Sequence, residues 1–403
     1  MKTLIELYDS EKIKNVTIAL LYKPETIIYL IQAGDLEQEM KEDIFYFFQS
    51  KKLHSNVLFC EVDLMDAKAI DMMLSGILKN YKDIVFDMSG GEDLLLIQVN
   101  HFCVTHNLLQ IYKDFDNLEL RFILGDSDEH KALKLPYLSI EDYLSLYGAK
   151  LELGGHYCPD RSQKKRIELL KGIIKINFDY QGDNKWSKFV DYIQAAASKC
   201  SQREEVNLNL EAPMRIRAKS GIQNCDLNIL YALEKVGAVK NIVIKNKDVR
   251  FRFIDDEIMG LLKVHGVWLE LYVYFQILEI NYFDDITMSA IVDWSPNDKN
   301  YLKNEIDLIA IRGVTPLFIS CKSSMTKLSL MALYEIKILC EEFGGKRAKA
   351  VLLSTDDIYN KHYNLYVRAR ELDICILDKW DIDHNHLAED FKEITEEKYC
   401  FRK

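Results

Sequence analysis

The sequence lacks any apolar run of the length that a membrane-spanning helix needs, which is about 18 residues. Its first residues, MKTLIELYDSEKIK, mix charges among the apolar positions, and this mixture is not typical of a signal peptide. We therefore expect neither a transmembrane span nor a cleaved leader, and no membrane partner.

Paired cysteine motifs and an excess of positive charge are also missing. The nine cysteines are scattered and form no CxxC pair, which excludes a zinc ribbon and favours reduced thiols in a cytoplasmic protein. Lysine and arginine number 52 against 63 acidic residues, a formal net charge of −11. Such a chain has no broad basic surface, so any nucleic acid must enter a locally basic groove.

What the sequence does contain is an alternation of strands and helices. A chain of 403 residues is long enough for two domains and a connector. Apolar runs at 3–8, 26–31, 57–62 and 84–88 alternate with helical patterns in the first half. Strands this apolar are typical of a parallel, doubly wound sheet that is covered on both faces, and such sheets bind ligands at the carboxyl ends of their strands.

Two loops at those carboxyl ends have residues that suit a ligand. They contain Asp9 and Ser10 after the first strand, and Ser89, Gly90, Gly91, Glu92 and Asp93 after the fourth. Consecutive glycines permit positive φ and a close approach of the backbone to a phosphate, whereas the carboxylates suit ribose hydroxyls and adenine amines. The alternative interpretation is a plain tight turn before a helix.

Three chemically matched residues follow one another in the second half. GVWLE begins a helix with Glu270, NEIDLIAI is a strand with Asp307, and FISCK is a strand that ends at Lys322. Residues 312–315 allow only a hairpin, so Asp307 and Lys322 are expected on adjacent antiparallel strands. Two carboxylates and the Cys321 backbone carbonyl can hold Mn²⁺ or Mg²⁺, and a lysine beside the cation can orient water and stabilise charge on phosphate. Taken singly, Glu270 fits a solvated helix and Lys322 a surface lysine, but their order favours a metal-dependent phosphodiesterase.

These motifs carry a family resemblance. GVWLE, NEIDLIAI and FISCKS, in this order, resemble the PD-(D/E)XK nuclease domain of CRISPR ancillary nucleases, and DMSGGEDL stands where that family has a glycine loop. Members join an N-terminal, Rossmann-like CARF sensor domain to the nuclease. The resemblance implies an α/β fold with a sensor domain at 1–150, a mostly helical connector at 151–245 and a restriction-endonuclease-like domain at 246–403.

The resemblance also implies an activity. It predicts a homodimer that binds a cyclic oligoadenylate, most often cyclic tetra-adenylate, and then cuts single-stranded DNA and RNA with Mn²⁺ or Mg²⁺. Glu270, Asp307 and Lys322 take the catalytic roles. The residues that it implies for the sensor pocket are Asp9, Ser10, Gly34, Ser89, Gly90, Gly91, Glu92 and Asp93.

The chain departs from the family pattern at two places. The usual ExK motif reads Ser320-Cys321-Lys322, so one acidic ligand is replaced by a hydroxyl, a poor donor for a hard cation; Glu335 on the following helix is our candidate replacement. The glycine loop, which commonly ends in Thr-Lys, ends here in Glu92-Asp93. Two alternatives stay open: a non-catalytic cyclic-nucleotide sensor with a degenerate nuclease domain, and a constitutive repair or restriction nuclease.

Overall fold

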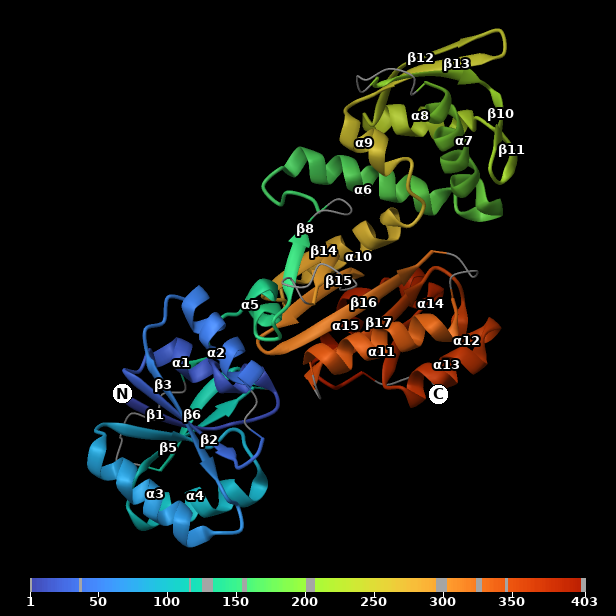
Figure 1. Cartoon of the computed structure of the whole chain (residues 1–403). Helices are drawn as coiled ribbons and strands as arrows, with labels where there is room; N and C mark the ends of the chain where they lie inside the picture. The colour runs from blue at the N-terminus through green and yellow to red at the C-terminus, as the bar shows by residue number, and fades with distance from the viewer. Residues whose placement is uncertain are drawn as a thin grey trace.

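The computed structural model describes residues 2–35, 38–115, 117–124, 133–153, 158–200, 207–294, 303–323, 328–344 and 347–399. It contains an N-terminal α/β region, a connecting region and a C-terminal α/β region (Figure 1). Among the helices described, none is long and apolar enough to cross a membrane.

The N-terminal region is the expected doubly wound sheet. Its strand order is β3-β2-β1-β4-β5-β6-β7, and the first five strands in this order are parallel. The strands are β1 (Thr3–Leu7), β2 (Thr26–Gln32), β3 (Asn56–Val62), β4 (Ile84–Asp87), β5 (Leu109–Asp114), β6 (Glu119–Leu124) and β7 (Leu133–Lys134). The sequence did not reveal β6 and β7, which are antiparallel additions at one edge.

Helices cover both faces of this sheet. Successive side chains on β1 point to opposite faces, and all of them are buried. Leu4 packs in one core with residues of the 3₁₀ helix η1 and of α1 and α2, and Ile5 packs in a second core with residues of α3 and α4. The helices are η1 (Lys12–Asn15), α1 (Thr17–Tyr22), α2 (Gln38–Ser50), α3 (Ala67–Asn80), α4 (Asp93–Thr105) and α5 (Ile140–Ser145). Of the expected first-half helices, the one from residue 36 has its start outside the described residues.

The C-terminal region is built on a mixed sheet in the order β18-β17-β16-β15-β14-β8. Its strands are β14 (Asp285–Asp293), β15 (Lys303–Arg312), β16 (Thr315–Lys322), β17 (Lys349–Ser354) and β18 (Ile374–Leu377), with β8 (Lys150–Leu153) at the edge beside β14. The helices are α10 (Val267–Ile280), α11 (Leu330–Gly344), α12 (Ile358–Lys361), α13 (Tyr363–Glu371), α14 (Lys379–Asp383) and α15 (Leu387–Thr395), whereas α9 (Asp256–Leu261) lies beside β13 (Asp248–Phe253) of the connecting region (Figure 1). This arrangement confirms the expected C-terminal α/β fold.

Strand β8 begins at the predicted first boundary, residue 150, but it belongs to the C-terminal sheet and not to the connecting region. The strand follows the exit helix α5 directly, yet it pairs antiparallel with β14, for example Leu151 with Val292. The chain therefore enters the C-terminal sheet at residue 150 and leaves it again for the connecting region. A four-residue edge strand is too short to give a recognisable alternation in the sequence.

The connecting region is helical only in its first part, so the prediction of a mostly helical segment at 151–245 is wrong for its second part. Helices α6 (Lys164–Asp179) and α7 (Lys185–Cys200) flank the 3₁₀ helix η2 (Gly182–Asn184). The later elements are β9 (Asn209–Pro213), β10 (Arg215–Ala218), β11 (Gly221–Asn224), α8 (Leu227–Val236), β12 (Val239–Lys245) and β13 (Asp248–Phe253).

The predicted boundary at residue 245 also falls inside a hairpin. Strands β12 and β13 pair from Val239–Phe253 to Lys245–Asp248, and β13 pairs with β9. Along β13, charged and apolar residues alternate between solvent and core, which is the pattern of a half-buried strand. The connecting region therefore extends to residue 253.

Candidate functional site

The carboxylate of Asp307 is the centre of a small polar cluster on the C-terminal sheet. Strands β15 and β16 form the predicted antiparallel hairpin, with Leu308 opposite Ile319. The Oδ2 atom of Asp307 accepts hydrogen bonds from the Cys321 backbone N–H at 2.6 Å and the Ser320 hydroxyl at 3.2 Å. The ammonium of Lys322 lies 3.4 Å from the same oxygen. The hairpin thus brings Asp307 and Lys322 together as the sequence predicts.

Glu270 reaches this cluster from the helix that covers the sheet. It lies in the first turn of α10, which packs against β14, β15 and β16. Burial, followed by the nearby carboxylates of Asp307 and Glu305, raises the pKa of Glu270 to about 8, against smaller lowering by the Ser289 hydrogen bond and by Lys322. The site therefore concentrates negative charge, and a cation bound there would favour ionised Glu270.

Ser289 holds the Glu270 carboxylate from the neighbouring strand β14. Its hydroxyl donates to Glu270 Oε2 at 3.4 Å. The residue is buried and has a φ of +49°, an unusual backbone conformation for a non-glycine residue within a strand. Backbone strain of this kind costs about 1–3 kcal/mol and is often found at functional sites. Sequence reasoning missed Ser289, since nothing in ITMSAIVDW marks the serine.

The oxygen donors present suit a hard divalent cation, although the described residues include no ready-made group of three acidic, histidine or cysteine side chains for one. Mg²⁺ commonly binds through one or two carboxylates and completes its shell with water and substrate phosphates, and Glu270 and Asp307 fit that requirement. The Cys321 backbone carbonyl stays a predicted ligand beside them. Glu335 is exposed on α11, and none of the described hydrogen bonds or ion pairs joins it to this cluster.

Glu305 is a nearer carboxylate that the sequence interpretation overlooked. It precedes Asp307 by two residues on β15, so both side chains leave the same face of the strand. Its charge acts on Glu270, as the raised pKa of Glu270 indicates. The period-2 spacing of Glu305 and Asp307 in NEID was the signal that could have revealed it.

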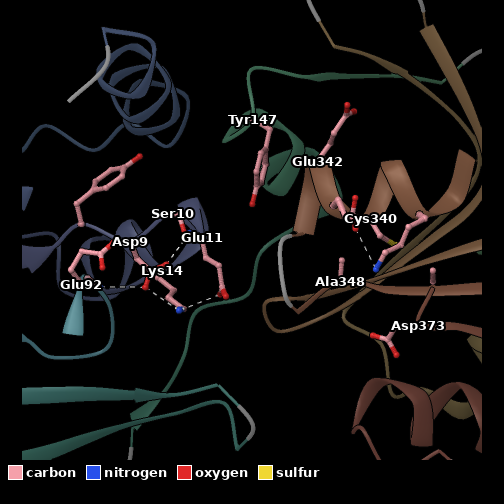
Figure 2. Close-up of a pocket in the computed structure, with 15 residues that line it drawn as sticks. Asp9, Ser10, Glu11, Lys14, Glu92, Tyr147, Cys340, Glu342, Ala348 and Asp373 are labelled. Carbon is pink, nitrogen blue, oxygen red and sulfur yellow. Dashed lines mark hydrogen bonds and ion pairs between the residues drawn. The ribbon is translucent and has the colours of Figure 1, made fainter. Parts of the chain in front are cut away.

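A second site lies where the N-terminal sheet faces the C-terminal region. It is a cavity of about 810 Å³ lined by both regions (Figure 2). From the N-terminal region come Tyr8, Asp9, Ser10, Glu11, Lys14, Gly91, Glu92 and Tyr147, and from the C-terminal region Lys337, Cys340, Glu341, Glu342, Ala348, Ala350 and Asp373. The cavity thus opens at the carboxyl ends of β1 and β4, where a doubly wound sheet binds ligands.

Four of the predicted ligand residues line this cavity, namely Asp9, Ser10, Gly91 and Glu92. The Gly91 N–H donates to Asp9 Oδ2 at 3.3 Å, which joins the two predicted loops. Gly91 has a φ of +90°, and a Cβ atom there would lie 2.6 Å from the Cβ of Leu7. Only glycine fits this turn without displacing β1.

The other predicted ligand residues lie beside the cavity or away from its lining. Gly90 packs against Asp9, and a Cβ atom on it would lie 2.9 Å from that carboxylate. The Ser89 hydroxyl accepts the Lys113 backbone N–H at 2.7 Å and donates to Asp87. Gly34 lies in the turn after β2, and Asp93 is the exposed first residue of α4. Their ligand roles stay predictions.

The C-terminal part of the lining was not predicted from the sequence. It comes from the last turns of α11 and from segments around residues 348–350 and 373. Figure 2 shows Cys340, Ala348 and Asp373 across the cavity from Asp9, Glu11 and Lys14. These segments come together only through tertiary packing, and no local sequence motif predicts their contribution to the cavity.

Comparison with known proteins places this geometry in context. Residues 255–395 match the family described as Card1-like, endonuclease domain. The model also resembles protein VC1899 from Vibrio cholerae, with a TM-score of 0.72, 17% identity, and coverage of 97% of this chain and 98% of the other. Can2 from Sulfobacillus thermosulfidooxidans, solved in complex with cyclic tetra-adenylate, gives a TM-score of 0.65, 16% identity, and coverage of 98% and 97%. No curated protein sequence matches the chain.

The family match assigns a Card1-like endonuclease domain to the part of the chain that contains Glu270, Asp307 and Lys322. The likeness to the two solved structures covers nearly the whole chain and shows the shared fold. The endonuclease-domain part of the resemblance is thereby confirmed, and the N-terminal part shares the fold of these two structures.

Proposed function

We propose that this chain, a CARF–nuclease ancillary protein, is an endonuclease activated by a cyclic oligoadenylate in type III CRISPR antiviral defence. The observation that carries the proposal is the convergence of Asp307 and Lys322 on one hairpin, with Glu270 above them, inside the Card1-like endonuclease domain. Its substrates are single-stranded DNA and RNA, and it acts with Mn²⁺ or Mg²⁺.

The roles of the three residues follow from their surroundings. Glu270 and Asp307 would hold a divalent cation, which would supply an activated water and neutralise charge on the phosphate. Lys322, 3.4 Å from Asp307, is placed to orient the attacking water and to stabilise the charge that develops on phosphate oxygens. The Ser320 hydroxyl and the Cys321 N–H fix the Asp307 carboxylate, and the Ser289 hydroxyl fixes Glu270.

Two observations, the cavity and a structural neighbour, support the proposed activator. Can2 was solved with cyclic tetra-adenylate, and this chain shares its fold over 98% of the residues. The cavity lies at the glycine loop of the corresponding N-terminal sheet, and its carboxylates suit the hydroxyl and amino groups of adenosine. We propose cyclic tetra-adenylate as the ligand and a homodimer as the assembly that binds it.

The test is a cleavage assay with the full chain. Labelled single-stranded DNA and RNA are incubated with Mn²⁺, with and without cyclic tetra-adenylate, for the wild type, Lys322→Ala and Lys361→Ala. Lys361 is an exposed lysine of the same domain and serves as the matched control. We expect activator-dependent cleavage by the wild type and Lys361→Ala, and a loss of at least about 100-fold in Lys322→Ala with unchanged activator affinity. Wild-type turnover in Lys322→Ala would remove Lys322 from the mechanism.

One observation favours a second candidate function, a sensor whose nuclease domain does not cut. Ser320 stands where the family motif has a carboxylate, and its hydroxyl donates a hydrogen bond to Asp307. Tight binding of cyclic tetra-adenylate without cleavage of any substrate would select this candidate. Cleavage that needs no activator would instead select a constitutive nuclease.

A further inference from the structure

The cavity contains lysines from two different domains. Among the described residues that line it, the cationic side chains are Lys14 of the sensor domain and Lys337 of helix α11 in the nuclease domain. Each is held by carboxylates of its own domain. Lys14 lies 3.0 Å from Asp9 and 3.4 Å from Glu11, and Lys337 lies 3.5 Å from Glu341.

The lining is otherwise acidic. Six carboxylates face two lysines, namely those of Asp9, Glu11, Glu92, Glu341, Glu342 and Asp373. An anionic ligand is repelled by this lining unless the lysines leave their carboxylates and pair with phosphate. Each of the two lysines therefore carries a large share of the attraction.

We propose that the phosphates of the activator are bound from both sides of the cavity, by Lys14 on the sensor domain and by Lys337 on the nuclease domain. This inference rests on the proposed function. The nuclease domain is then part of the binding site and senses the ligand directly.

Helix α11 is well placed to transmit that contact. It packs against β16 and β17, and its C-terminal turns line the cavity. Its N-terminus follows, along the chain, the end of β16 where Lys322 lies. The 15 residues of α11 form a rigid element about 22 Å long between the cavity and the segment after Lys322.

A second connection joins the same two domains. The guanidinium of Arg347, just after α11, lies 3.7 Å from Glu11 and over the ring of Phe115 at 5.0 Å. Glu11 is thus shared between Lys14 and Arg347. A phosphate that pairs with Lys14 in place of Glu11 alters the electrostatic interaction between Glu11 and Arg347. Because Arg347 belongs to the nuclease domain, this domain is affected by the bound ligand.

The experiment measures the affinity of the full chain for cyclic tetra-adenylate by isothermal titration calorimetry. The variants are Lys14→Ala, Lys337→Ala, Lys337→Arg and Lys361→Ala, the last being the control outside the cavity. We expect a loss of about tenfold or more in Lys14→Ala and in Lys337→Ala, because each loses a charge-assisted hydrogen bond. Lys337→Arg keeps the charge and is expected to restore most of the affinity.

A further variant separates a ligand contact from a structural role. Glu341→Gln removes the carboxylate that holds Lys337 and lowers the negative charge of the cavity. We expect it to bind the activator more tightly than the wild type, whereas loss of a merely structural ion pair would leave the affinity unchanged or lower it.

The outcomes also distinguish this inference from the proposed function. If Lys14→Ala loses affinity while Lys337→Ala and Glu341→Gln bind like the wild type, the ligand contacts the sensor domain alone and the inference is wrong, although the proposed function stands. If the wild type does not bind cyclic tetra-adenylate, the proposed activator itself is wrong.

Discussion

Replacement of Glu270 by glutamine should stabilise the metal-free protein at alkaline pH although it removes a group to which we assign a catalytic role. The pKa of Glu270 is raised from 4.5 to about 8, first by burial and then by Asp307 and Glu305. The unfolded chain therefore binds fewer protons than the folded chain between these two values. Stability linked to Glu270 is fully present below about pH 4.5 and is lost as the pH rises through about 8.

The magnitude follows from the same two values. The interval between 4.5 and 8 corresponds to about 5 kcal/mol at most. The Glu270 side chain is only half-buried, and screening by the water that reaches it reduces this penalty. We expect the wild type to lose about 1–3 kcal/mol of unfolding free energy between pH 5.5 and pH 8, and the Glu270→Gln variant to lose much less.

The assay is urea denaturation in the presence of a chelator at both pH values. Glu279→Gln is the control, because Glu279 lies in the last turn of the same helix and its ion pair with Lys171 is exposed. Mn²⁺ should restore the stability of the wild type at pH 8 and not that of Glu270→Gln. Equal pH slopes for the wild type and Glu270→Gln would refute a buried, carboxylate-rich environment at Glu270.

Three other substitutions test separate parts of the structure. Lys113→Met leaves buried carboxylates unpaired and should cost about 3–5 kcal/mol of unfolding free energy, measured by urea denaturation; a loss below 1 kcal/mol would contradict the pairing. Gly91→Val meets Leu7 and requires a φ that valine avoids, so calorimetry should detect weaker binding of cyclic tetra-adenylate; wild-type affinity would move the pocket elsewhere. Ser320→Glu restores the family's carboxylate and should raise Mn²⁺ affinity about tenfold, measured by electron paramagnetic resonance; unchanged affinity would show that position 320 does not face the cation.

The site on the hairpin was predictable because its residues lie close together in the sequence. Asp307 and Lys322 lie on strands joined by the two residues Gly313 and Val314, and a loop this short fixes their pairing. Glu270 was predictable because α10 immediately precedes the strand that it covers. Ser289 was not, since its role depends on a left-handed backbone that no sequence pattern encodes for serine.

The cavity and the connecting region show the opposite case. Lys337 and Asp9 line one cavity only through the packing of two domains, and they are far apart along the chain. In β13, charged side chains occupy the exposed face, and Val249, Phe251 and Phe253 alternate with them on the buried face. Strand β12 has no such alternation of burial, since its Val243 and Ile244 are exposed, and it therefore gives no period-2 signal.

Two clusters in this chain combine a pair of carboxylates with one lysine, and solvent access distinguishes their roles. In the sensor domain, Lys113 lies 2.6 Å from Asp87 and 3.7 Å from Glu6, and all three side chains are at most 2% exposed. Burial, then Asp87, raises the pKa of Glu6 well above its ordinary value, which favours its neutral form and lowers the negative charge beside Lys113. Its function is structural, because Lys113 also donates to the Lys14 carbonyl and its N–H to Ser89, which fixes both ligand loops.

In the nuclease domain the Lys322 and Asp307 side chains keep 20% and 19% of their surface exposed. A hydrated cation and a phosphate can therefore reach Asp307 and Glu270, and a bound cation would favour the ionised form of Glu270. The same composition thus makes a structural ion cluster where water is excluded and the proposed cation site where water enters.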